Sequence, residues 1–115
     1  VMNTDEYLEG IPKDFQVEVP CLINGKGCFP MHQESLNKPI LAYALRDKVA
    51  PYEMELAAFN EGSYDLLLSL ILMDPYTRSE KQAIELLDAI LNTPGLEEMK
   101  AHYRKGRRWK IGGED

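Results

Sequence analysis

The sequence is poor in the residues that usually indicate a reaction or a special environment. Its 115 residues include only two cysteines, two histidines and one tryptophan. It contains no G-x-G-x-x-G or P-loop motif, no G-x-S-x-G motif, and neither H-E-x-x-H nor C-x-x-C. These absences remove the usual signatures of nucleotide-binding loops, serine hydrolases, zinc hydrolases and thiol redox enzymes. Taken alone, the residues support no catalytic assignment.

Long hydrophobic runs are also missing. The most apolar stretch, Leu66–Met73, has eight residues and is interrupted by Ser69, whereas a membrane-spanning helix needs about 20. No signal peptide is evident at the start, and Val1 is not an initiator methionine. We therefore expect a cytoplasmic protein without a membrane segment, and we expect the sequence to begin partway along a longer protein.

The composition is that of one small globular unit. Hydrophobic residues make up 44% and charged residues 28% of the chain, which is typical of soluble domains. A length of 115 residues allows one domain and no more. We expect residues 1–115 to be a single domain or a fragment of one, with a lead-in rich in β structure and turns (1–33), a helical body (34–105) and a basic tail (106–115).

Charge is distributed unevenly along the chain. Residues 1–99 carry 7 basic and 17 acidic side chains, whereas residues 100–115 carry 6 and 2. An acidic body repels phosphate backbones, so we expect no nucleic-acid partner. The segment Arg104–Lys110 is basic and contains an aromatic residue. It is either the cationic end of a C-terminal helix that runs into a solvated tail, which we favour, or a contact surface for an acidic partner.

The cysteines and one histidine lie close together in the sequence. Cys21 and Cys28 are seven residues apart, and His32 follows four residues later. Three such side chains can bind a metal, but a closed zinc site needs four ligands. A disulfide would need an oxidising compartment, which nothing here indicates. We expect both cysteines to act as small hydrophobic residues in or beside a strand, and we assign no metal, cofactor or catalytic residue to this chain.

Other candidate residues have a structural explanation that outweighs a functional one. The glycine-rich Asn24–Gly27 does not open a helix, so we expect a plain turn and not a phosphate site. Glu53 and Glu55 are two residues apart and would point to different sides of a helix. Glu97 and Glu98 suit the first turn of a helix through its dipole. Four aromatic residues are expected in the core or at an interface: Tyr43, Tyr52, Phe59 and Tyr64.

The first third of the chain predicts a small β ribbon over about residues 15–30. Phe15–Val19 alternates apolar and polar residues, as a strand with one buried face does, and stops at Pro20. Leu22-Ile23 is a second apolar step, followed by Asn24-Gly25, a strong hairpin-turn signal. Gly27–Pro30 would be the returning strand.

From about residue 35 the apolar spacing changes to that of helices. Pro39 fits a first helical turn, whereas Pro51 predicts either two helices that meet near Ala50 or one helix bent there. Glu61-Gly62 is a helix stop.

Three helix starts follow this stop. Ser63 and Ser79 are expected to cap helices, and Thr93-Pro94 to begin the last one. The Leu66–Met73 helix is apolar on so many sides that we expect it to be enclosed. The predicted fold class is therefore α+β, mainly helical, with one ribbon followed by four or five packed helices.

Four stretches, taken in order, resemble glycoside hydrolase family 4. Gly10–Pro20 resembles the family's N-L-P-x-D-x-x-V-E-V-P passage, and Cys21–Pro30 resembles the A-L-V-D-x-x-G-I-H-P that follows it. Tyr52–Ala58 parallels its V-Q-E-L-T-V-E-A-A helix, and Leu70–Thr77 parallels its A-L-L-L-D-P-L-T. Order and spacing agree from about residue 3 to residue 92, and the basic tail has no counterpart.

The resemblance implies the C-terminal part of a glycosidase that depends on NAD and a divalent metal, usually manganese. In this family the cofactor oxidises the sugar at C3, the metal stabilises the enediolate formed by deprotonation at C2, and elimination, water addition and reduction follow. The family's nucleotide-binding glycines, metal ligands and base precede the matched passage, so Cys21, Cys28 and His32 do not take those roles. Gly10 and Phe29 stand where the family usually has Asn and often has His, which leaves the sugar open.

The resemblance also implies partners and a fold. The C-terminal domain of the family is α+β and resembles that of lactate dehydrogenase; it packs against an N-terminal Rossmann domain, walls the cleft for a sugar or sugar phosphate and supplies much of a homo-oligomer interface. The parent protein would be an enzyme, but this segment alone would not. We expect an exposed apolar face, with Leu66–Met73 as its candidate. The alternative hypothesis is a free-standing helical module that binds an acidic partner through Arg104–Lys110.

Overall fold

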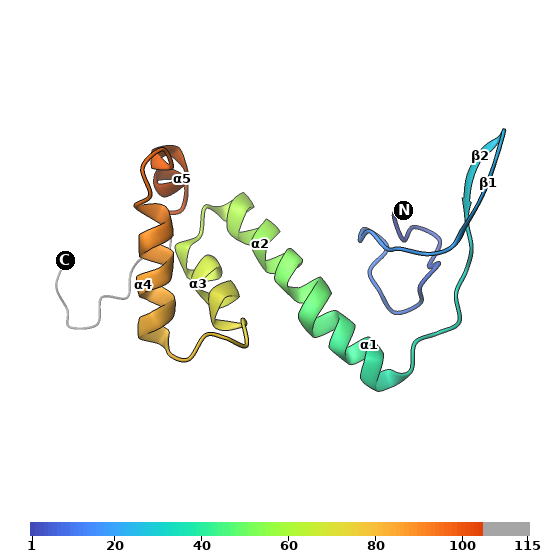
Figure 1. Cartoon of the computed structure of the whole chain (residues 1–115), viewed down its shortest axis with the longest axis horizontal. Helices are drawn as coiled ribbons and strands as arrows, with labels where there is room; N and C mark the ends of the chain where they lie inside the picture. Colours follow the sequence, from blue (N-terminus) through green and yellow to red (C-terminus); the bar gives the residue numbers. More distant parts are fainter. Residues whose placement is uncertain (105–115) are drawn as a thin grey trace. The chain divides into compact units, whose positions relative to one another are not determined.

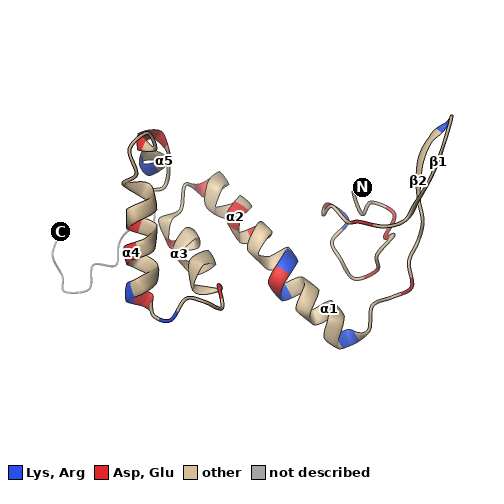
Figure 2. Cartoon of the chain, in the orientation of Figure 1, with Lys and Arg blue, Asp and Glu red and all other residues tan. Residues whose placement is uncertain are grey.

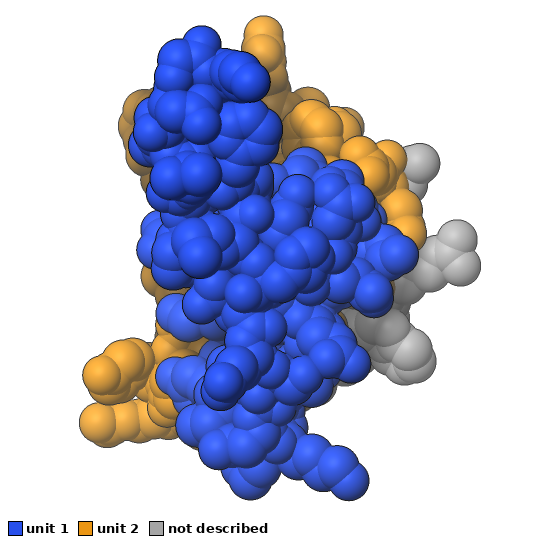
Figure 3. All heavy atoms as spheres, turned by 90° about the vertical axis from the view of Figure 1, so that its right-hand side faces the viewer, with its two compact units in different colours: residues 1–50 blue, residues 51–115 orange. Residues whose placement is uncertain are grey.

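A computed structural model describes residues 1–104 of the chain (Figure 1). The described chain divides into two compact units, residues 1–50 and residues 51–104, coloured blue and orange in Figure 3. The predicted tail 106–115, and all of Arg104–Lys110 except Arg104 itself, lie outside the described residues. That tail, the boundaries of the lead-in and helical body, and the single domain over residues 1–115 all stay predictions.

The predicted fold class is confirmed: the structure is α+β and mainly helical. A two-stranded ribbon comes first and the helices follow it (Figure 1). No helix in the described part of the chain is long and apolar enough to cross a membrane. The elements are β1 (Cys21–Asn24), β2 (Gly27–Pro30), α1 (Lys38–Ala44), the π-helical η1 (Leu45–Val49), α2 (Ala50–Glu61), α3 (Tyr64–Leu72), α4 (Glu80–Leu91) and α5 (Glu97–His102).

The hairpin lies where the sequence predicts it. Strands β1 and β2 pair in antiparallel fashion from Cys21 opposite Pro30 to Asn24 opposite Gly27. The Asn24 side chain accepts a hydrogen bond from the main-chain N–H of Lys26 at 2.8 Å, which is how asparagine stabilises a tight turn. The glycine-rich Asn24–Gly27 is therefore a turn, as expected, and not a phosphate loop.

The ribbon does not extend back to residue 15, so that part of the prediction is wrong. Exposure alternates as expected, with Val17 buried and Gln16 exposed. The pairing segment is too short for a strand: Val17 N–H donates to the main-chain oxygen of Val1 at 2.8 Å, and Met2 and Gln16 form an isolated bridge. After Asn3 the chain leaves this short pairing and forms a loop, because the Asn3 side chain hydrogen-bonds to main-chain groups of that loop.

Asn3 organises that first loop. It is fully buried, and its amide nitrogen donates to the main-chain oxygens of Leu8 and Ile11, each at 2.9 Å. Its side-chain oxygen accepts from Leu8 N–H at 3.0 Å, so the buried amide is satisfied. The core of residues 1–50 forms beside it from Ile11, Val17 and Val49, with Leu8, Phe15, Val19, Leu41, Ala44 and Leu45 packed around them.

Helical backbone continues past Pro51. Asn37 caps α1 by accepting from Ile40 N–H at 3.1 Å, and Pro39 lies in the first turn as predicted. A proline ring collides with the carbonyl four residues before it and donates no hydrogen bond. Here the helix widens to a π-helical turn just before the proline, where Ala50 N–H donates to the Leu45 oxygen five residues back. The wider turn accommodates Pro51 without ending the helix.

The predicted caps of α3 and α4 are confirmed. The Ser63 hydroxyl accepts from Leu66 N–H at 3.2 Å, and the Ser79 hydroxyl accepts from Gln82 N–H at 3.1 Å. The Gln82 side chain accepts from Arg78 N–H at 2.7 Å, so the return bond of this capping box reaches one residue further back than usual.

Helix α3 packs on α4, and α4 packs on α5. The buried centre consists of Tyr64, Leu87 and Leu91. Tyr64 is the only buried residue of α3; Leu72 is exposed, and the other leucines of this helix are half-buried. The expectation that Leu66–Met73 is enclosed is therefore wrong, because within this unit one main partner helix covers it.

The last helix begins later than the sequence predicts. Thr93 does not cap it; its hydroxyl donates back to the Ala89 oxygen at 3.1 Å, and its own carbonyl accepts from Leu96 N–H at 3.1 Å. Gly95 has a φ of +90° in this turn. Because Thr93 completes the end of α4, α5 starts only at Glu97.

Two glycines allow a test of how closely α5 approaches the start of α3. Gly62 and Gly95 both have positive φ, +64° and +90°, but a Cβ at 62 would lie 2.5 Å from the His102 main-chain oxygen, whereas a Cβ at 95 meets open space. Either alanine costs about 1–2 kcal/mol for its left-handed backbone. Urea denaturation should show a further loss of about 1–3 kcal/mol for Gly62→Ala alone. Equal losses for the two variants would contradict the close approach.

Candidate functional site

The structure does not gather the cysteines and His32 into a metal site. Cys21 is half-buried and Cys28 exposed, and both thiols are free. The Nε2 atom of His32 hydrogen-bonds to the main-chain oxygen of Asp5 at 2.9 Å, and its ring lies 4.9 Å from that of Tyr7. Across residues 1–104 no three His, Cys, Asp or Glu side chains are placed to hold a metal ion. His32 therefore has a structural role in tying residues 31–33 to the first loop.

The four acidic candidates of the sequence lie on helices. Glu53 and Glu55 are exposed on α2, and Glu97 and Glu98 lie in the first turn of α5 as expected. Glu97 accepts from Gly95 N–H at 3.1 Å. Hydrogen bonds from its own main-chain N–H and then from that of Gly95 hold the pKa of this carboxyl below its usual range. This is the chemistry of a helix cap and not of a general acid.

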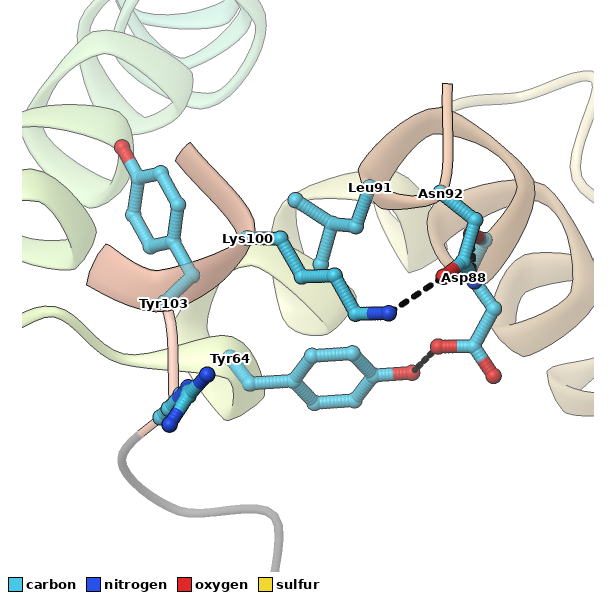
Figure 4. A pocket seen from close by; sticks show the side chains of 7 residues that line it. Tyr64, Asp88, Leu91, Asn92, Lys100 and Tyr103 are labelled. Carbon is cyan, nitrogen blue, oxygen red and sulfur yellow. Dashed lines mark hydrogen bonds between the residues drawn. The ribbon is translucent and has the colours of Figure 1, made fainter. Parts of the chain in front are cut away.

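A pocket of about 360 Å³ lies among α3, α4 and α5 (Figure 4). The Tyr64 hydroxyl donates to Asp88 Oδ1 at 2.9 Å, and Lys100 Nζ donates to Asn92 Oδ1. The first bond links α3 to α4, and the second links α5 to the end of α4. The pocket is lined by Tyr64, Asp88, Leu91, Asn92, Lys100, Tyr103 and Arg104.

The polar groups of this pocket are used to fasten the helices. Tyr64 is only 5% exposed, so its hydroxyl needs a partner to avoid a desolvation cost, and Asp88 provides it. Asn92 also donates from its side chain to the Asp88 main-chain oxygen at 2.7 Å. These contacts make the pocket a structural junction.

Helix α2 carries an apolar surface instead. Tyr52, Leu56 and Phe59 are 61%, 57% and 58% exposed, and their spacing of four and three residues places them on one face of the helix. We call these three residues the α2 stripe. With Glu55 and Tyr103 they line a shallow groove of about 340 Å³. Contiguous exposed apolar residues of this kind mark interaction surfaces.

Helix α5 supports one end of the α2 stripe. His102 donates through Nε2 to the main-chain oxygen of Phe59 at 2.6 Å, and the two rings lie 5.0 Å apart. The Tyr103 ring meets the His102 ring edge-on at 4.9 Å. Phe59 and Tyr103, which both line the groove, are 44 positions apart in the sequence, which is why periodicity alone did not reveal it.

The predicted aromatic and apolar candidates are thus divided between core and surface. Tyr64 is buried, whereas Tyr43, Tyr52 and Phe59 are more than half exposed. The predicted exposed face at Leu66–Met73 is less exposed than the α2 stripe, since its residues are half-buried except Leu72 at 44%. The most exposed apolar helix face described here is on α2.

The Tyr64–Asp88 bond can be tested by removing one oxygen. Tyr64→Phe should lower the free energy of unfolding by about 1–2 kcal/mol, because the buried junction loses a hydrogen bond to a carboxylate. Tyr76→Phe is the matched control, since Tyr76 is 87% exposed, and it should change stability by less than about 0.5 kcal/mol. Urea denaturation measures both. A similar effect of the two substitutions would show that the bond does not stabilise the junction.

Comparison with known protein families assigns the chain to a family. The family 4 glycosyl hydrolase C-terminal domain matches residues 1–77, which covers the hairpin, the α2 stripe and the whole of α3. Helices α4 and α5, with most of the Tyr64 pocket, lie beyond the match. The predicted family is confirmed, and it accounts for the V-E-V-P passage, the hairpin and the Asp74-Pro75 step together. The chain belongs to the family 4 glycosyl hydrolases and represents their C-terminal domain.

Proposed function

We propose that this chain is the C-terminal region of a cytoplasmic, NAD- and manganese-dependent glycosidase that hydrolyses O-glycosidic bonds of a sugar or sugar phosphate by oxidation and elimination. Its own part is to pack against the preceding nucleotide-binding domain, to wall the substrate cleft and to form part of a homo-oligomer interface. The observation that carries this proposal is the family match over residues 1–77. The α2 stripe, which lies inside the match, supports the packing role.

The described residues, 1–104, do not fit either cofactor. A dinucleotide needs a glycine-rich turn between a strand and a helix N-terminus, but Asn24–Gly27 joins two strands of a hairpin. A divalent metal needs several converging ligands, and among residues 1–104 no three side chains of the right kind converge. We therefore place both groups in the preceding region and assign no step of the reaction to a residue of this chain.

The α2 stripe has the chemistry of a packing surface. Full burial of one leucine or phenylalanine side chain is worth about 1.5–3 kcal/mol, and aromatic residues often dominate interfaces. Glu55 lines the same groove and would supply a polar group at its edge. A domain seated through this groove would be held rigidly beside the cleft without contacting the reacting atoms.

The alternative of a free-standing module that binds through Arg104–Lys110 draws on no observation in the described residues, where only Arg104 of this segment is placed. We do not propose it.

The proposal predicts that the natural protein is much larger than this chain. Its intact mass, measured on material purified with an antibody to residues 1–104, should far exceed the 13.1 kDa of the chain, because a nucleotide-binding domain must precede it. The purified protein should cleave nitrophenyl glycosides only when NAD and Mn²⁺ are both supplied. The 115-residue chain assayed beside it should be inactive. A natural protein of about the chain's own mass, or cleavage independent of NAD, would overturn the proposal.

Substitutions on the α2 stripe test the packing role. Leu56→Gln and Phe59→Ser in the natural protein should each reduce glycosidase activity by about tenfold, since each removes one anchor of the contact. The isolated chain should lose no more than about 1 kcal/mol of stability, because both side chains are more than half exposed and only Phe59 has a ring contact, with His102. Leu86→Gln on α4 is the control, with a side chain 49% exposed outside the groove. Equal losses for the three variants would argue against the stripe as the contact surface.

A further inference from the structure

Cys21 and Cys28 lie on the same face of the hairpin. Cys21 is opposite Pro30, and Cys28 is opposite Ile23. Because side chains alternate between the two faces of a strand, these four residues share one face and the two cysteines are diagonal neighbours. Seven residues apart in sequence, the two sulfurs are thus brought together by the Asn24-Gly25 turn.

The Cys28 thiol affects the pKa of Cys21, and the two thiols differ in their exposure to solvent. The neighbouring Cys28 thiol, and then burial, raise the pKa of Cys21 above its ordinary value. The Cys21 sulfur donates to the main-chain oxygen of Val19 at 3.4 Å, whereas Cys28 is exposed. Cys28 is therefore the thiol that a reagent from solution meets first, and Cys21, which donates its proton to the Val19 oxygen, is the less accessible of the two. This asymmetry is that of an attacking and a resolving cysteine.

The exposed hairpin can change the twist of its strands. Diagonal neighbours in an antiparallel pair are separated by about 7–8 Å between their Cα atoms, which is just beyond the usual Cα separation across a disulfide. Closing a disulfide between Cys21 and Cys28 therefore requires a change in the twist of the two strands. Leu22 and Ile23 are 60% and 76% exposed, so a change of twist disturbs few packed neighbours. The strands themselves carry no charged residue; the nearest one is Lys26 in the turn (Figure 2). A bond closed against such strain is one that reducing agents reopen easily.

We propose that Cys21 and Cys28 form a reversible redox pair that closes to an intrachain disulfide in the presence of a peroxide. The Cys28 thiolate attacks one oxygen of the peroxide, the O–O bond breaks, and Cys28 becomes a sulfenic acid as the other oxygen leaves as water. The Cys21 sulfur then attacks the Cys28 sulfur, the S–O bond breaks, and the hydroxyl leaves as a second water with the proton of Cys21. Two thiols lose two electrons, and one hydrogen peroxide is reduced to two waters. The pair is independent of the proposed glycosidase role.

Peroxide titration of the 115-residue chain tests the pair. After hydrogen peroxide and then N-ethylmaleimide, the chain should carry no maleimide and weigh about 2 Da less than the reduced chain, with both alkylation sites restored by dithiothreitol. Cys21→Ser should stop at a Cys28 sulfenic acid that dimedone traps. Cys28→Ser should be oxidised about tenfold more slowly, because only the less accessible thiol remains.

A matched control moves one thiol to the other face. Phe29 is opposite Leu22, so the double variant Cys28→Ser, Phe29→Cys keeps two cysteines in the hairpin but points them to opposite sides. It should form no intrachain disulfide under conditions that close the original pair. The proposal is overturned if this variant closes as readily, or if the unmodified chain gives only sulfinic acid or disulfide-linked dimers.

Discussion

The close approach of α5 to the start of α3 is the constraint on which residues 51–104 depend. The main-chain oxygen of His102 lies where a side chain at Gly62 would be, so only glycine allows the two segments to meet. One residue later Ser63 caps α3, and the next residue, Tyr64, bonds to Asp88 of α4. A left-handed turn, a cap and a half-buried hydrogen bond thus follow one another along three residues, and together they set the positions of three helices.

The same junction shapes the surface that the proposed function uses. His102 reaches back to the main-chain oxygen of Phe59, so the helix that closes against Gly62 also supports the end of the α2 stripe. Tyr103 continues this support and lines the groove with Tyr52, Leu56 and Phe59. A domain whose part is to pack against another needs a rigid apolar face more than it needs reactive groups. The polar side chains of the pocket are accordingly engaged in holding helices together.

Local signals in the sequence were read correctly where the structure is made by neighbouring residues. The Asn24-Gly25 turn, the first-turn Pro39 and the Ser63 and Ser79 caps each depend on contacts within about four residues. The signals failed where a distant group took over. Thr93 bonds back to α4, and Phe15–Val19 pairs with the first residues of the chain and forms no strand. A hydroxyl or an alternating segment is compatible with several partners, and the sequence does not say which one lies nearby.

The sequence by itself therefore determined the fold class, the hairpin, the Ser63 and Ser79 caps and the family, because turn chemistry, helix period and an ordered series of motifs are all local properties. Tertiary structure alone decided which apolar residues stay exposed. Tyr52, Tyr64 and Phe59 look alike in the sequence, yet Tyr64 is buried against α4 and the other two line a groove. It also decided that two cysteines share one hairpin face and that Tyr64 meets Asp88, 24 residues away. The physical reason is that burial and pairing depend on which elements pack together, and packing is a property of the whole unit.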